Sequence, residues 1–247
     1  MSISGPGIVV SAPPFDTERR RRQPRFYPYS ATPASVESVG AGIATLVTPV
    51  LTLGTTAVAV NEIKAFGELF ASSTTFFYTD LAGKTFWNRP QRASVNIVML
   101  VSVNPNANSF TGLQIGRHGT VFPWGLATEP FIQLRANLAT LIWELAYAKG
   151  DAVGADQVVA LSNAVVQQPI PGGAYSYRLE IDYSPANFIT VRVNGVVGAT
   201  VAANANFPIV TKDATVGANV FVSKGNLVAD QTQSAFHNHE TETLGAP

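Results

Sequence analysis

The clearest pattern in the chain is an alternation of apolar and polar residues between Tyr175 and Val201. In the segment 175–183, the odd-numbered residues are Tyr, Tyr, Leu, Ile and Tyr, whereas the even-numbered residues are Ser, Arg, Glu and Asp. A period of two places alternate side chains on opposite faces of a strand. Two further alternating segments flank Asn194-Gly195, a dipeptide that accepts the positive φ angles of a two-residue hairpin turn. The pattern predicts a half-buried strand followed by a β-hairpin.

Short segments of the same kind recur from about residue 36 and are separated by sequences rich in Gly, Pro, Asn and Asp, which form turns. The predicted strands are Gly42–Leu53, Thr56–Ala65, Ser73–Thr79, Ser94–Val103, Ser109–Arg117, Phe131–Leu134, Leu138–Tyr147, Gln157–Val166, Ala174–Tyr183, Phe188–Val193, Val196–Val201 and Ala214–Val222. Residues 138–148 also suit a helix by composition, although their alternation favours a strand, and a short helical turn near 62–70 is a second alternative. Many short strands with little helix predict an all-β jelly-roll sandwich.

Both ends of the chain lack this alternation. Residues 1–35 contain six prolines and no periodic apolar pattern, which is typical of an extended segment that pairs poorly in sheets. The last residues are polar and are expected to run over the surface or onto a partner. The predicted organisation is therefore a Pro/Arg-rich arm at 1–35, a β-sandwich domain at 36–224 and a polar C-terminal tail at 225–247.

Composition narrows the classes of protein. Charged residues make up 13% of the chain, about half the usual share. The 16 basic and 16 acidic residues cancel, so no global field attracts nucleic acid or a membrane. Cysteine is absent, which excludes disulfides, a thiol nucleophile and cysteine zinc sites. The uncharged stretch 41–60 contains Pro49 and several threonines, so we expect strands there and not a transmembrane helix.

The segments Tyr177–Tyr183, Val191–Val197 and Thr215–Asn219 resemble the last third of a concanavalin A-like or laminin G-like jelly roll. The resemblance implies a fold that hosts lectins, hydrolases, adhesion modules and virion proteins. Glycosidases of this superfamily usually carry Glu-x-Asp-x-x-Glu on one strand. Here Glu180 and Asp182 match, but Pro185 stands where the final Glu would be, so we expect no enzymatic activity.

The arm, the poorly charged Ala/Val/Thr/Asn-rich sandwich and the lack of cysteine also resemble a tailed-phage virion protein. This resemblance implies a non-enzymatic capsid decoration or tail component, made in the host cytoplasm and located in the virion. Its partners would be copies of itself and a major capsid or tail protein, with no membrane contact. Two alternatives remain open: a glycan-binding, lectin-like module for attachment to a host or surface, and a small-virus coat protein with an RNA-binding arm.

The arm carries a dense basic cluster. Arg19, Arg20, Arg21, Arg22 and Arg25 place five guanidinium groups within seven residues. Such groups form forked ion pairs with carboxylates of a neighbouring subunit. They also neutralise nucleic-acid phosphates, or remain solvated without a specific ligand. Subunit contact is the favoured interpretation, and nucleic acid is not expected as a partner.

Three smaller motifs contain residue types that could carry chemistry. Trp124 lies in a loop-like segment and is the candidate for stacking on a sugar ring. Glu180 and Asp182 share one strand face as a glycosidase pair would, but we favour a plain wet face. His237 and His239 have a spacing that suits a metal, although an incidental role is favoured. No metal or cofactor is expected.

Overall fold

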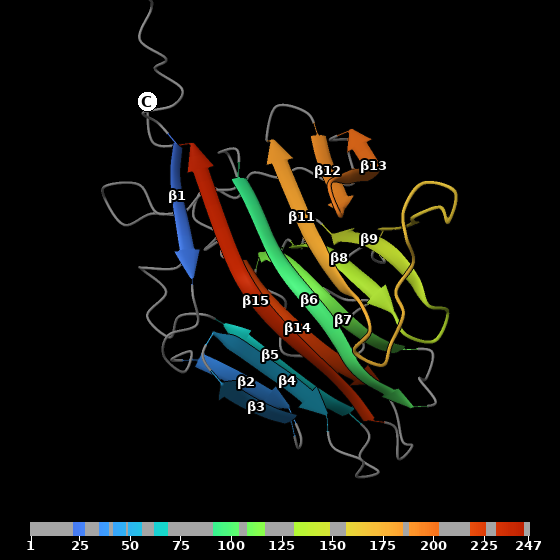
Figure 1. Cartoon of the computed structure of the whole chain (residues 1–247). Coiled ribbons are helices and arrows are strands. Elements are labelled where there is room, and N and C mark those ends of the chain that lie inside the picture. Colours follow the sequence, from blue (N-terminus) through green and yellow to red (C-terminus); the bar gives the residue numbers. More distant parts are fainter. Residues whose placement is uncertain are drawn as a thin grey trace, which may run out of the picture.

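The computed structural model describes residues 22–27, 35–39, 42–47, 49–55, 62–68, 91–103, 108–116, 131–148, 157–184, 188–202, 218–225 and 231–244. Every regular element in these ranges is a β-strand, arranged in two stacked sheets (Figure 1). The predicted all-β jelly-roll sandwich is therefore confirmed. The described residues contain no helix able to cross a membrane. The strands are β1 (Arg22–Tyr27), β2 (Ser35–Val39), β3 (Gly42–Val47), β4 (Val50–Thr55), β5 (Glu62–Glu68), β6 (Gln91–Val103), β7 (Asn108–Gly116), β8 (Phe131–Asn137), β9 (Ile142–Ala148), β10 (Gln157–Ala160), β11 (Ser176–Ser184), β12 (Phe188–Val193), β13 (Val196–Ala202), β14 (Ala218–Gly225) and β15 (Gln231–Leu244).

The two sheets are antiparallel throughout. Sheet A has the order β13-β12-β11-β6-β15-β4-β3, and sheet B has the order β10-β9-β8-β7-β14-β5-β2. Strand β15 has β6 on one side along most of its length. On its other side it pairs with β4 through residues 233–236 and with β1 through residues 239–244. Strand β15 is therefore an interior strand of sheet A (Figure 1).

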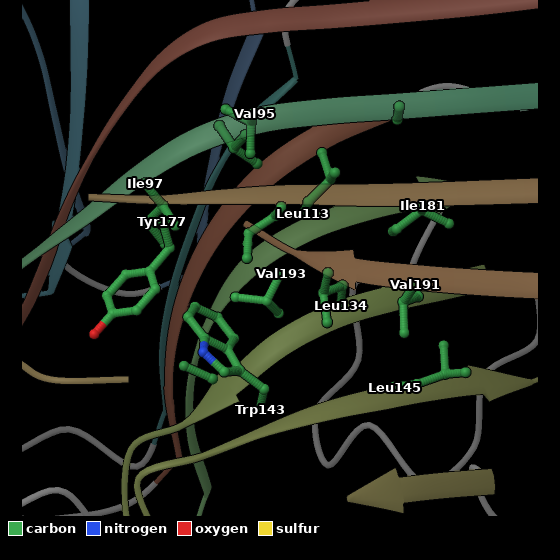
Figure 2. Close-up of a cluster of buried hydrophobic side chains, with 14 of the residues drawn as sticks. Val95, Ile97, Leu113, Leu134, Trp143, Leu145, Tyr177, Ile181, Val191 and Val193 are labelled. Carbon is green, nitrogen blue, oxygen red and sulfur yellow. The ribbon is translucent and has the colours of Figure 1, made fainter. Parts of the chain in front are cut away.

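The core fills the space between the sheets. Sheet A contributes side chains such as Ile97 and Ile181, and sheet B contributes Leu134 and Leu145, all of them fully buried (Figure 2). In β11 the residues alternate strictly between buried and partly exposed, as the sequence predicts. The alternation between Tyr177 and Val193 thus marks the inner face of sheet A, whereas β13 is partly or fully exposed along its length.

The predicted hairpin is confirmed in its turn as well as its strands. Asn194 and Gly195 have φ angles of 53° and 78°, which is the left-handed geometry of a type I′ turn. The Asn194 side-chain oxygen accepts a hydrogen bond of 2.8 Å from the backbone N–H of Arg178. The turn is therefore tied to β11, the neighbouring strand of the same sheet.

Several strand predictions need correction. The segment 42–53 is a hairpin of two strands, β3 and β4, because Pro49 interrupts it. Residues 138–141 form a turn before β9, and the helix alternative for 138–148 is wrong. The helical turn considered near 62–70 is strand β5 where the structure describes it. The predicted strand 73–79 lies outside the described residues.

The assignment of residues 225–247 to a polar tail is wrong for most of that range. Residues 231–244 form β15, whose inward positions include Ser234 and Phe236, both fully inaccessible to solvent. The strand escaped detection because its inner face is largely polar. The Ser234 hydroxyl accepts a hydrogen bond of 3.0 Å from the Thr111 hydroxyl of the opposite sheet, which offsets the cost of burying it.

The predicted arm also contributes to the sandwich. Residues 22–27 form β1 on sheet A, and residues 35–39 form β2 on sheet B. Pro24 is tolerated in β1 because this short strand pairs only with β15 among the described strands, and an edge position can lack a donor. The rest of the arm lies outside the described residues.

Candidate functional site

The outer face of sheet A carries a cluster of charged side chains. The even-numbered residues of β11, Arg178, Glu180 and Asp182, lie on the face opposite the core. Neighbouring strands add Arg92 from β6, Arg192 from β12 and Glu240 from β15. These six residues, hereafter the charged face, have three positive and three negative groups and so no net formal charge.

Arg178 is the centre of the charged face. Its guanidinium donates hydrogen bonds to the Ser94 hydroxyl at 2.6 Å, to the Glu240 carboxylate at 2.8 Å and to the Asn238 carbonyl at 3.0 Å. The same side chain lies 3.8 Å from Glu180. One planar fork thus joins β11 to β6 and β15, a geometry that Arg provides and Lys does not.

Asp182 organises the other end of the charged face. Its carboxylate pairs with Arg92 at 3.1 Å and with Arg192 from the opposite side. Arg92 also approaches Glu180 at 3.8 Å. The six side chains therefore hold one another across four strands, and exposed fractions from 18% for Glu180 to 48% for Glu240 leave them in contact with solvent.

This geometry bears on whether Glu180 and Asp182 form a glycosidase pair. The two residues do share one solvent-facing surface of β11, as the alternation predicts. Each carboxylate lies beside a guanidinium group: Arg92 is 3.8 Å from Glu180 and 3.1 Å from Asp182. The two acidic side chains therefore belong to a network of ion pairs that presents hydrogen-bond donors and acceptors side by side.

A β-bulge at Asn238 sets which residues of β15 reach the charged face. Asn238 has a φ of 51°, and the pairing with β6 shifts from His237 opposite Asn96 to Glu240 opposite Ser94. The extra residue moves Glu240 onto the outer face and turns His239 inward. His239 is completely buried, and burial lowers its pKa to about 3.

The same bulge removes the metal motif considered from the sequence. His237 remains partly exposed, whereas His239 points into the sandwich, so the two imidazoles do not converge. Within the ranges that the structure describes, no three His, Cys, Asp or Glu side chains are grouped to hold a metal.

A second polar group lies on the outer face of sheet B, but it is enclosed. Gln133 donates to Gln114 at 2.7 Å, and Arg135 donates to Gln133 at 3.1 Å and to Glu144 at 3.2 Å. The Arg135 guanidinium also stacks 3.9 Å above the Phe110 ring. The side chain of Arg135 is only 6% exposed and that of Glu144 12%, so a ligand from solvent has little access. We interpret this network as structural.

None of the residues predicted as contact sites from the sequence belongs to the charged face. Arg22 and Arg25 lie in β1, opposite Leu244 and Thr241 of β15. Arg19, Arg20, Arg21 and Trp124 lie outside the described residues. The proposed contacts of the arginine cluster and of Trp124 therefore stay predictions.

Sequence reasoning found only part of the charged face. The alternation identified the wet positions of β11 and β12, and so placed Arg178 and Arg192. Arg92 and Glu240 were missed because they meet β11 only through the register of β6 and β15. No local pattern in the sequence reports that register.

Comparisons with known proteins bear on the fold. No protein-family model matches the sequence, and no curated protein matches it. The structure is similar to the carbohydrate recognition domain of Emp47p, with a TM-score of 0.52 and 9% identity over 92% of this chain and 96% of that one. It is also similar to the laminarinase catalytic domain from Thermotoga maritima MSB8, with a TM-score of 0.52 and 10% identity over 83% of this chain and 81% of that one.

A third similar structure is the apo Crh5 transglycosylase, with a TM-score of 0.51 and 11% identity over 92% of this chain and 85% of that one. Neighbours of this fold thus include both a carbohydrate-recognition domain and carbohydrate-active enzymes. At such low identities the similarity establishes the concanavalin A-like jelly-roll fold and leaves activity to be argued from the residues.

Proposed function

We propose that the protein is a non-enzymatic, carbohydrate-binding β-sandwich and that the charged face is its ligand surface. The observation that carries this proposal is the charged face itself: three guanidinium and three carboxylate groups, fixed on four neighbouring strands and open to solvent. The glycan-binding alternative from the sequence is thereby preferred to the virion role.

The chemistry of the charged face suits the hydroxyl groups of a sugar. Each sugar hydroxyl both donates and accepts, so it needs acceptors such as carboxylates beside donors such as guanidinium groups. The mutual ion pairs hold these groups in place before a ligand arrives, which lowers the entropy lost on binding. Because the six charges cancel, the expected ligand is a neutral oligosaccharide.

The absence of catalysis is part of the proposal. Glu180 and Asp182 are each paired with arginine, and Pro185 replaces the third acidic residue of the glycosidase motif. Incubating the purified chain with neutral polysaccharides should release no reducing ends. If it does, and Glu180→Gln abolishes the release, the protein is an enzyme.

A glycan array followed by titration calorimetry tests the binding site. Arg178→Lys keeps the charge but loses the planar fork, and we expect it to weaken binding by about tenfold. Asp182→Asn should do the same because it releases two arginines. Asn163→Ala, an exposed change outside the charged face, should have no effect. Binding that survives both charged-face substitutions would place the ligand elsewhere.

Binding should also depend only weakly on salt. A surface without net charge releases few counterions when a neutral ligand binds, so raising the ionic strength should change the affinity by less than about threefold. Calorimetry at two salt concentrations measures this. A steep loss of affinity with salt would instead indicate an anionic ligand.

The virion role remains a second candidate. Its structural support is β13, the last strand of sheet A, which has no charged residue and exposes Val196 and Val197 by nearly half. Terminase, portal and tail genes next to the coding sequence would support this role. Neighbouring genes for polysaccharide use would contradict it.

A further inference from the structure

The turn between β12 and β13 pairs with the backbone of Arg178, the central residue of the charged face. The ladder between β11 and β12 begins at the pair Leu179 and Val193, so Arg178 lies one residue beyond its end. The Arg178 carbonyl nevertheless accepts a hydrogen bond of 2.8 Å from the Asn194 backbone N–H. The Arg178 N–H donates a second one, also of 2.8 Å, to the Asn194 side-chain oxygen. The side chain of Asn194 thus extends the ladder by one residue.

This contact depends on the residue type at the turn. In a regular antiparallel ladder, two opposed residues exchange both hydrogen bonds through their backbones. Here the Asn194 side-chain oxygen takes the place of the backbone carbonyl. Asn, Asp and Gly all accept the φ of 53° found at this position, but only Asn and Asp also offer a side-chain acceptor. The turn conformation and the hydrogen bond to Arg178 are therefore separable requirements.

Arg178 is consequently held from two directions. Its backbone is paired with the turn on the β12 side, whereas its guanidinium reaches across β6 to β15. On that side it donates to the Ser94 hydroxyl at 2.6 Å and to the Glu240 carboxylate at 2.8 Å. A planar fork meets such partners only while the backbone that carries it stays in place, because a shift of the Cα is passed on to the end of the side chain.

We infer that Asn194 is a positioning residue of the charged face: it fixes the backbone of Arg178, so that the guanidinium fork is in place before a ligand arrives. Asn194 acts through Arg178 and not by touching the ligand. A fork that is already ordered loses less entropy on binding, which raises the affinity. The effect on binding rests on the carbohydrate proposal, whereas the effect on Arg178 is present without any ligand.

Nuclear magnetic resonance of the full chain tests the effect on Arg178 directly. Asn194→Gly keeps the positive φ but removes the acceptor, and Asn194→Asp keeps both. In Asn194→Gly we expect the Arg178 amide to exchange about fivefold faster or more, relative to the amide of Ile181 in the same strand. The guanidinium N–H signals of Arg178, separate while the fork is held, should merge. Asn194→Asp should restore both properties, which a general loss of stability would not explain.

Titration calorimetry tests the consequence for binding. The probes are neutral glucan hexasaccharides, one β-1,3-linked and one β-1,4-linked. We expect Asn194→Gly to weaken binding by about three- to tenfold, chiefly through a less favourable entropy, because the fork must then be ordered by the ligand. Asn194→Asp should recover most of the affinity.

The two measurements distinguish a failure of this inference from a failure of the carbohydrate proposal. Arg178 signals that Asn194→Gly leaves unchanged, or that Asn194→Asp fails to restore, would overturn the role of Asn194. Undiminished binding in Asn194→Gly would do the same if Arg178→Lys weakens binding. A chain that binds neither hexasaccharide, or binds them regardless of Arg178, would instead refute the carbohydrate proposal, and the Arg178 signals would still decide whether Asn194 positions the fork.

Discussion

At the scale of single residues, the β-bulge at Asn238 determines the pKa of His239. The extra residue at Asn238 turns the imidazole into the sandwich, where burial, and secondarily the charge of Arg178, lowers its pKa to about 3. The unfolded chain, with a histidine pKa near 6.5, binds a proton in a pH range where the folded chain does not. Stability must therefore fall as the pH drops from 6.5 toward 3.

We expect this linkage to cost about 2 kcal/mol of unfolding free energy between pH 7 and pH 5. His239→Leu should flatten the pH dependence by that amount, measured by urea unfolding at several pH values. His237→Leu is the matched control. The pKa of His237 is also lowered, by burial and by Arg178, but this side chain is only partly buried, so its replacement should change the pH dependence less. A His239→Leu curve parallel to that of the parent would show that the histidine is not enclosed.

At the scale of secondary-structure elements, Gly112 sets the spacing between β7 and β8 of sheet B. A Cβ at this position would lie 2.1 Å from the carbonyl oxygen of Leu134 and 2.8 Å from the Cα of Arg135, both backbone atoms of β8. The sheet can accept it only by moving β7 away from β8. Gly112→Ala should therefore destabilise the fold by about 1 to 3 kcal/mol, measured by chemical unfolding.

Gly54 of β4 provides the comparison. Its added Cβ would meet nothing closer than 3.4 Å, so Gly54→Ala should be neutral or slightly stabilising, since alanine also restricts the unfolded chain. Equal losses in both variants would mean that strand propensity, and not the close approach, sets the cost.

Strand identity was also predictable only where one face is apolar. Strands β11 and β12 were found because their inward residues are aliphatic or aromatic and no bulge interrupts β11. Strand β15 was missed because Ser234 faces the core and the bulge at Asn238 breaks the period of two. Strand β8 shows the opposite difficulty, since Gln133 and Arg135 are polar in sequence yet buried.

For the whole molecule, the central position of β15 leads to a clear expectation. Deleting residues 231–247 removes the strand that joins β6 to β4 and β1, so the chain should fail to fold cooperatively. Thermal melting followed by circular dichroism should show no transition. Deleting only residues 245–247, which follow β15, is the control. A stable product lacking residues 231–247 would restore the predicted polar tail.

The sequence by itself determined the all-β class, the inner face of β11, the Asn194-Gly195 hairpin and the lack of cysteine chemistry. Each of these follows from neighbouring residues, through a period of two or a turn preference. Only the tertiary structure decided that Arg92 and Glu240 join Arg178, that His239 is enclosed and that β15 is an interior strand of sheet A. Those facts depend on strand register and order, which are fixed by packing between segments far apart in the chain.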